Sequence, residues 1–308
     1  MNHLTYLEAI VVGALQGVTE LFPVSSLGHS ILIPALVGGS WADDLNVSKP
    51  ESPYLAFIVG LHVATALALL LFFWRDWLRI VSGFVTSVRY RRLRTSSERL
   101  AWLLIAGTVA VGISGLLLEH LFRTTLGRPI PAAVFLIANG LVLYLGEVLR
   151  RRVDSTSAAP VPAGVEGPGT ARDDGAAADA RLARLSVGRA ALIGSAQIFA
   201  LLPGISRSGV TMVAGLLRGL SHEDAARFSF LLATPVILAA GALKIPDLFG
   251  PLGAGIGGPI LVGSLASFVS AYLSVRFLTR YFETRTLIPF AIYCVLAGTA
   301  SLLWLTLH

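Results

Sequence analysis

Charged side chains are scarce in this sequence. Asp, Glu, Lys and Arg make up 14% of its 308 residues, whereas hydrophobic residues make up 55% and the mean hydropathy is +0.74. Soluble domains typically carry about 25% charged residues, so the composition excludes an ordinary soluble domain and indicates a protein of the lipid bilayer.

Cysteine is also nearly absent. The single thiol, Cys294, excludes an intrachain disulfide and any cysteine-rich metal site. The N-terminus lacks a cluster of Lys or Arg ahead of an apolar stretch with a small-residue cleavage site, so we expect no signal peptide and a chain that starts near the membrane.

The positive charge of the chain is concentrated in loops. A net charge of +6 and a pI near 9.9 could suggest nucleic acid, but seven arginines lie within residues 75–99, against Asp76 and Glu98. Three more, Arg150 to Arg152, end an apolar stretch. Such clusters are typical of cytoplasmic loops, so we predict no nucleic-acid partner and place these segments inside the cell.

Apolar stretches of about 20 residues, enough to span a bilayer, recur along the chain. They lie at about 54–74, 100–119, 132–149, 227–245, 260–278 and 287–307. Two further apolar segments, 5–38 and 189–219, are interrupted by Pro23 and Pro203. Each of these two segments predicts a re-entrant helix–break–helix hairpin, which enters and leaves the membrane on the same side.

The two breaks also suggest an internal repeat. Aligning Pro23 with Pro203 divides the chain into repeat 1 (1–150), a linker (151–188) and repeat 2 (189–308), each repeat holding one hairpin and three spans. Because three is odd, the repeats must have opposite orientations, as in many transporters. The predicted fold is an all-α polytopic membrane protein with an inverted-topology repeat and both termini outside.

Residues 153–186 have a different composition from the rest. Ala, Gly, Pro, Ser and Asp dominate and no apolar periodicity is visible. We therefore expect a flexible cytoplasmic linker with no packed core, and expect that shortening it to about ten residues leaves activity largely intact.

The first hairpin, 5–38, concentrates polar groups at its break. Gln16 and Glu20 share a helical face, and Ser25, Ser26 and His29 follow Pro23 at the start of the next helix. Ionisable groups at membrane depth usually face a cavity or pathway. A buried Glu near a Ser or His can act as a general base or can orient the imidazole.

The second hairpin, 189–219, repeats this layout and adds Arg207. Helix N-termini attract phosphate oxygens, and arginine binds phosphate through two parallel hydrogen bonds. Together the two breaks predict a site for phosphate chemistry. The residues we expect to contact substrate are Gln16, Ser25, Gly28, Gly204, Ser206, Ser208, Gly209 and Thr211. Structural roles remain alternatives: Gln16 and Glu20 could bond helices together, and Glu20 with Arg207 could form a buried ion pair.

Other polar residues of the apolar stretches are less informative. His62 and Thr65 lie on the first full span, where an interhelical hydrogen bond explains them as well as a role in the site. His222 follows Ser221 and precedes acidic residues, as at the start of a helix.

The stretches QGVTELFPVSSLGH and LLPGISRSGVT resemble the two signature segments of the undecaprenyl-diphosphatase family of the bacitracin-resistance type. The resemblance continues through LHVATALALLLFFWRD, FSFLLATPVILAAGAL and IPFAIY, and so covers nearly the whole chain except the linker. It implies removal of the terminal phosphate of undecaprenyl diphosphate in the bacterial plasma membrane, which recycles the lipid carrier for cell-wall synthesis. The implied site lies between two re-entrant hairpins and opens to the outer face.

By their positions in these motifs, four residues are the implied catalytic groups. Ser26 matches the family's proposed nucleophile, His29 the adjacent histidine, Arg207 the phosphate-binding arginine, and Glu20 the second acid of the Glu/Gln-x-x-x-Glu element. Gln16 takes the first place of that element as the permitted amide. Whether Ser26, His29 or a water attacks phosphorus is left open.

The resemblance further implies a divalent cation, Mg²⁺ or Ca²⁺. Because Gln16 is uncharged, Glu20 is the only carboxylate of this segment able to bind it, and the ion could arrive on the diphosphate. Leu27 stands where the family often has Thr, which removes one hydroxyl. The remaining alternatives are a flippase for a polyprenyl phosphate and the other lipid-phosphatase superfamily, whose His and Asp would follow the second element sooner than His222 and Asp224 do. A homodimer and surrounding membrane lipids are the other partners considered.

Overall fold

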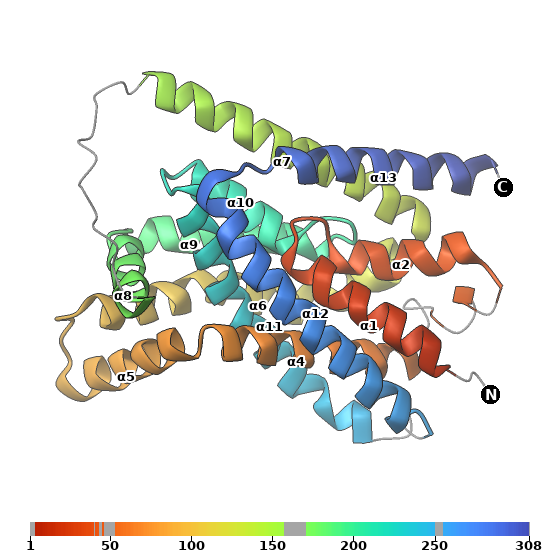
Figure 1. Cartoon of the computed structure of the whole chain (residues 1–308), viewed down its shortest axis with the longest axis horizontal. Helices are drawn as coiled ribbons and strands as arrows, with labels where there is room; N and C mark the ends of the chain where they lie inside the picture. The colour runs from red at the N-terminus through yellow and green to blue at the C-terminus, as the bar shows by residue number, and fades with distance from the viewer. Residues whose placement is uncertain are drawn as a thin grey trace.

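The structure of the chain is a computed structural model that describes residues 4–39, 41–42, 45, 53–156, 171–249 and 255–307. Within these residues the regular elements are helical, and no strand is formed. The helices, arranged as in Figure 1, are α1 (Tyr6–Leu21), α2 (Ser26–Val37), α4 (Pro53–Phe72), α5 (Trp74–Tyr90), α6 (Ser96–Leu126), α7 (Pro129–Thr156), α8 (Ala171–Leu182), α9 (Val187–Ser195), the 3₁₀ helix η1 (Ala196–Leu201), α10 (Arg207–Leu216), α11 (His222–Phe249), α12 (Gly257–Thr284) and α13 (Ile288–Leu307).

Five helices of the described part are long and apolar enough to cross a membrane: α6, α7, α11, α12 and α13. A sixth span would come from α4, which meets α5 at an angle of 86° after a break at Phe73. The six apolar stretches predicted from the sequence coincide with these helices. The chain is therefore an all-helical, multi-pass membrane protein.

Both expected hairpin breaks are present. Between α1 and α2, Ser25 caps α2 in a left-handed conformation (φ 72°), and its hydroxyl accepts a hydrogen bond from the Gly28 amide at 3.2 Å. Between η1 and α10, the Ser206 hydroxyl accepts from the Gly209 amide at the same distance. A serine cap followed three residues later by glycine therefore begins the second helix of each hairpin.

Residues 75–99, which we treated as a loop, contain most of a helix. The structure places α5 over Trp74–Tyr90, followed by a short turn and the start of α6. Ile80, Gly83 and Ser87 are buried on one side of α5, with the Gly83 position directly against the Glu98 backbone of α6. These buried residues are three or four positions apart, the spacing of one face of a helix. The prediction of a loop was based on the number of arginines and did not use this spacing.

The expectation of a flexible linker also needs correction. The helix α7 continues to Thr156, and residues 171–182 form α8, whose Asp179 and Leu182 are fully buried. Residues 157–170 of the expected linker lie outside the described residues.

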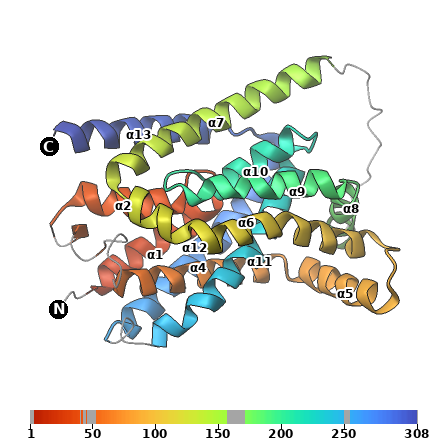
Figure 2. The same cartoon turned by 180° about the vertical axis from the view of Figure 1, so that it is seen from behind.

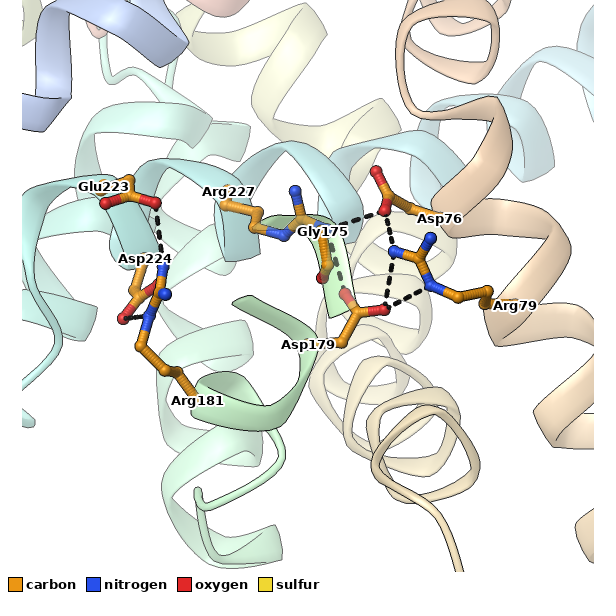
Figure 3. Close-up of polar contacts among 8 residues, drawn as sticks. All are labelled: Asp76, Arg79, Gly175, Asp179, Arg181, Glu223, Asp224 and Arg227. Carbon is orange, nitrogen blue, oxygen red and sulfur yellow. Dashed lines mark hydrogen bonds and ion pairs between the residues drawn. The ribbon is translucent and has the colours of Figure 1, made fainter. Parts of the chain in front are cut away.

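Ion pairs hold α8 in place (Figure 3). Asp179 accepts hydrogen bonds from Arg79 of α5, at 3.1 Å from Nη2, and from Arg227 of α11, at 3.0 Å. Arg181 lies 2.8 Å from Glu223 and pairs with both oxygens of Asp224 at 3.0 Å. Composition and apolar periodicity do not detect a helix that packs chiefly through charged partners.

The arginine-rich segments gather at one end of the molecule. At this end Glu147 of α7 contacts both His222, the first residue of α11, and the Leu287 amide that precedes α13. The helices α5 and α8 lie at the same end, whereas both chain termini lie at the other (Figure 1).

The two halves of the described chain, residues 4–156 and 171–307, pack against each other through several pairs of helices. The first helix of each hairpin lies along the middle span of the other half, α1 on α12 and α9 on α6, and the last spans α7 and α13 pack together (Figure 2). A Cβ on Gly13 would collide with the Gly263 carbonyl, and one on Gly194 with that of Gly107. Backbone therefore approaches backbone at corresponding places in both pairs.

Candidate active site

The carboxylate of Glu20 is the centre of a polar cluster between the two breaks. Glu20 lies in the last turn of α1 and is 8% exposed. Its Oε2 accepts hydrogen bonds from Gln16 Nε2, at 3.0 Å, and from the Ser26 hydroxyl across the break. The four-residue spacing of Gln16 and Glu20 places both on one face of α1, and Pro23 turns the chain so that Ser26 returns to that face.

Two basic side chains face the same carboxylate. Arg207, the first residue of α10, places Nη2 3.6 Å from Glu20 Oε1, and His62 of α4 places Nε2 3.4 Å from Oε2. The Nδ1 of His62 donates to the Ile58 carbonyl at 2.9 Å, which directs Nε2 toward the site. The structure thus brings together Gln16, Glu20, Ser26 and Arg207 as predicted, and adds His62.

His29 is close to the cluster but is held by other partners. Its Nδ1 donates to the Ser25 carbonyl at 2.7 Å, so Nε2 of the neutral ring accepts from the Tyr293 hydroxyl at 2.8 Å. The Tyr293 ring stacks on the imidazole with centroids 5.8 Å apart. The structure records no hydrogen bond between His29 and Ser26 or Glu20, so the two candidate bases occupy different environments.

Asn139, in the middle of α7, joins the two breaks. Its Nδ2 donates to the Pro23 carbonyl at 3.0 Å and its Oδ1 accepts from the Ser206 amide at 2.9 Å. One fully buried amide thereby satisfies a backbone group of each break. Neither Asn139 nor Tyr293 was predicted from the sequence. Asn139 is a polar residue in an apolar stretch, which is as typical of an interhelical hydrogen bond as of a site, and Tyr293 ends the IPFAIY stretch without a role assigned to it.

Several residues expected at the substrate instead contact protein. The hydroxyls of Ser206 and Ser208 donate to the Phe22 carbonyl of the first break, at 3.4 and 3.2 Å. The Thr211 hydroxyl donates to the Arg207 carbonyl at 2.7 Å and is almost completely buried. In this arrangement these three hydroxyls position the second break and Arg207.

The glycines of the breaks allow close approach. Gly204 has φ +110°, a conformation that side chains rarely adopt. A Cβ on Gly28 would lie 2.9 Å from the Gly204 Cα, and one on Gly209 would lie 3.3 Å from Pro23 Cβ. The two breaks are therefore in direct backbone contact.

Two polar atoms of the cluster have unused hydrogen-bonding capacity. Within the described residues, the buried Arg207 Nη1 and Gln16 Oε1 have no hydrogen-bond partner. A buried donor or acceptor without a partner costs about 1–3 kcal/mol, so such atoms are expected to receive a ligand. Arg207 Nη1 suits a phosphate oxygen, and Gln16 Oε1 suits a cation or a protonated oxygen.

The fit of a divalent cation depends on the same atoms. Among the described residues no group of three or more His, Cys, Asp and Glu side chains is arranged to hold a metal ion. Glu20 and the free Gln16 Oε1 supply oxygen ligands of the type that Mg²⁺ and Ca²⁺ prefer. The cluster can therefore supply part of a coordination shell, which oxygens of a bound substrate and water would complete.

Comparison with known proteins gives a consistent result. Residues 9–300 match the family described as Bacitracin resistance protein BacA. The chain is 70% identical over 307 residues to an undecaprenyl-diphosphatase of Mycolicibacterium paratuberculosis, with 99% of each chain covered. It is 54% identical to undecaprenyl-diphosphatase 1 of Frankia casuarinae, with 97% of each covered. It is 42% identical to undecaprenyl-diphosphatase 2 of Burkholderia ambifaria, with 97% of this chain and 96% of the relative covered.

Proposed function

The chain belongs to the bacitracin resistance protein BacA family, and we propose that its polar cluster hydrolyses undecaprenyl diphosphate to undecaprenyl phosphate and phosphate. The observation that carries the proposal is the convergence of Ser26 and Arg207, from different hairpins, on the Glu20 carboxylate. A hydroxyl, a base and a phosphate-binding cation are the minimum set for phosphoryl transfer through a serine.

We assign the base to Glu20. The Ser26 hydroxyl already donates to Glu20, whereas both ring nitrogens of His29 are occupied by Ser25 and Tyr293. Glu20 takes the Ser26 proton as the Ser26 oxygen bonds to the terminal phosphorus, and the bond from that phosphorus to the bridging oxygen breaks. Undecaprenyl phosphate leaves, and a water then releases phosphate from Ser26.

Arg207 supplies the charge stabilisation. Its free Nη1 is available to a phosphate oxygen while Nη2 faces Glu20, so one guanidinium contacts both the base and the substrate. The N-terminus of α10, from which Arg207 projects, and the N-terminus of α2 add partial positive charge near the phosphoryl group. A divalent cation bound by the diphosphate, Glu20 and Gln16 would neutralise further phosphate charge.

Ser26 and Arg207 both contact the Glu20 carboxylate in this structure. The cavity beside Gln16 and His29 is not lined by these three residues, and at about 10 Å³ it holds no more than a single water. A diphosphate has to reach both Ser26 and Arg207, so we propose that substrate entry separates the two hairpins. The contacts among Phe22, Asn139, Ser206 and Ser208 are those that must adjust.

We further propose that the halves form an inverted repeat and that the arginine-rich end faces the cytoplasm. In each half the first hairpin helix packs on the middle span of the other half, α1 on α12 and α9 on α6, which supports the repeat. Both termini lie at the end opposite the arginine-rich segments, which supports the orientation. A cysteine placed in residues 157–170 of a Cys294→Ser background should be labelled by an impermeant reagent only from the cytoplasmic side. Labelling from outside would reverse the orientation.

The competing function is a flippase for a polyprenyl phosphate, since inverted repeats are common in transporters. Purified protein in detergent should release inorganic phosphate from undecaprenyl diphosphate, and a Ser26→Ala variant should not. Phosphate released at the rate of a protein-free control would reject the enzyme and leave the flippase.

The attacking group can be identified separately. Rapid acid quenching of the unaltered protein during turnover of substrate labelled in its terminal phosphate should leave label on a peptide containing Ser26. Substantial turnover by Ser26→Ala would exclude the serine route and favour direct attack by water. A phosphorylated His29 in the unaltered protein would move the nucleophile three residues along.

A further inference from the structure

The C-terminal part of α12 carries an open groove away from the catalytic cluster. The groove measures about 470 Å³, and its walls include three guanidinium groups and three apolar or aromatic side chains. These are Arg276, Arg280, Arg285, Leu273, Phe277 and Tyr281. The four-residue spacing of Arg276 and Arg280 places them on neighbouring positions of one helix face.

The three arginines of the groove make no polar side-chain contact that would stabilise the fold of the described residues. Within the described residues none of them takes part in an ion pair or a side-chain hydrogen bond, whereas Arg181 and Arg227 at the same end each form ion pairs with two carboxylates. Glu283, on the same helix, is exposed and does not pair with them. Attraction to the C-terminal dipole of α12 accounts for one arginine near the last turn, but it does not require three around a common groove.

An apolar stripe leads from this groove along α12. The exposed side chains Leu261, Leu265, Val269 and Leu273 follow one another every four residues, each between 49% and 71% exposed, and Phe277 continues the series into the groove. At 1.5 Å per residue the stripe is about 24 Å long, most of the thickness of a bilayer's hydrocarbon core. A stripe on a membrane-spanning helix that no other described element covers is in contact with lipid.

We propose that this groove binds the phosphate headgroup of an anionic phospholipid, with an acyl chain along the stripe. Guanidinium groups bind phosphate through paired hydrogen bonds, and basic pockets at the cytoplasmic side of membrane helices select anionic headgroups. The arginines lie at the arginine-rich end, the end proposed to face the cytoplasm. The site is separate from the catalytic cluster, and its test does not depend on phosphatase activity.

The experiment measures lipid retention. Protein reconstituted in nanodiscs of equal phosphatidylglycerol and phosphatidylcholine is released and its bound lipids are counted by native mass spectrometry. The full chain should retain phosphatidylglycerol preferentially. An Arg276→Ala/Arg280→Ala variant should bind it about thirtyfold more weakly, because each arginine loses its attraction to an anionic headgroup.

An Arg189→Ala/Arg218→Ala variant is the matched control. It removes the same charge from exposed arginines at the same end, and should retain phosphatidylglycerol within about twofold of the unaltered chain. Thermal unfolding in neutral detergent checks that both variants fold, and Arg276→Lys/Arg280→Lys replaces the alanine variant if it does not. The lysine variant should lose less affinity but should still bind more weakly than arginine.

Several results would overturn the proposal. If the groove variant and the control lose the same affinity for phosphatidylglycerol, the effect comes from the overall positive charge and not from the groove. If the unaltered chain retains phosphatidylglycerol and phosphatidylcholine equally, the groove does not select an anionic headgroup. Displacement of the lipid by millimolar glycerol 3-phosphate would show a site for a free phosphate. A dimer mass that disappears in the groove variant would identify a second copy of the chain as the occupant.

Discussion

The two hairpin breaks have the same frame and different chemistry. Each begins its second helix with a capping serine, Ser25 or Ser206, whose hydroxyl accepts from the amide of a glycine three residues later. The first break then carries Glu20 and Ser26, the proposed base and the proposed nucleophile. The second carries one cation, Arg207, and hydroxyls that donate to the first break.

This difference shows how the site divides its tasks. In the proposed mechanism proton transfer takes place in the first hairpin, while the second hairpin contributes charge and position. Because the two breaks are in close contact at Gly28 and Gly204, a change of volume in one break displaces the backbone of the other. Substitutions matched between the breaks can separate the two tasks.

The largest effect is expected for Glu20→Gln in the first break. The amide keeps the shape of the side chain but cannot accept the Ser26 proton, so kcat should fall by about a thousandfold. The measurement is phosphate release from undecaprenyl diphosphate in detergent. Glu147→Gln, which changes a buried carboxylate at the arginine-rich end, is the control and should retain turnover. Turnover within tenfold in Glu20→Gln would assign the base elsewhere.

Next comes Arg207→Lys in the second break. Lysine keeps the charge but cannot contact Glu20 and a phosphate oxygen with one planar group, so kcat/KM should fall about a hundredfold, or roughly 3 kcal/mol of transition-state stabilisation. Steady-state kinetics on the purified variant measures it, with the exposed Arg218→Lys as control. Near-normal turnover would show that the second break contributes only a generic positive charge.

A third variant tests the link between the breaks. Asn139→Leu leaves the Ser206 amide and the Pro23 carbonyl without this partner, and should lower the free energy of unfolding by about 2 kcal/mol. Denaturation in mixed detergent micelles measures the loss. Asn139→Asp should lose at least as much, because its buried carboxylate can accept from Ser206 but faces the Pro23 carbonyl without a donor. Equal stability of Asn139→Leu and the unaltered chain would mean that the breaks are held by backbone packing alone.

The smallest effect is expected between the halves, in residues 157–170. Shortening this segment from fourteen residues to about ten should change stability by only about 0.3 kcal/mol and leave phosphate release intact. Removing α8 as well should be much more harmful, because it leaves the guanidinium groups of Arg79 and Arg227 without Asp179. Comparable phosphate release by both deletion variants would show that residues 153–186, including α8, act only as a linker, as the sequence predicted.

Much of the fold could be predicted because its causes are local. Long apolar stretches identify membrane helices, and Pro23 and Pro203 within short ones identify the breaks. The helix α5 was missed because its arginines outweighed its apolar spacing. The helix α8 was missed because its stability depends on Arg79 and Arg227, which lie far away in the sequence.

For the candidate site, the sequence by itself determined the residues within each hairpin: Gln16, Glu20 and Ser26 in one and Arg207 in the other. Helical spacing and a proline break are enough to place neighbours in sequence on one side of a hairpin. Only the tertiary structure decided that His62 faces Glu20, that Tyr293 occupies His29, and that Asn139 joins the breaks. Those contacts join residues 42 to 264 positions apart in the chain. At such separations the partner of a polar side chain is set by packing and by the cost of leaving it unpaired, not by its neighbours in the chain.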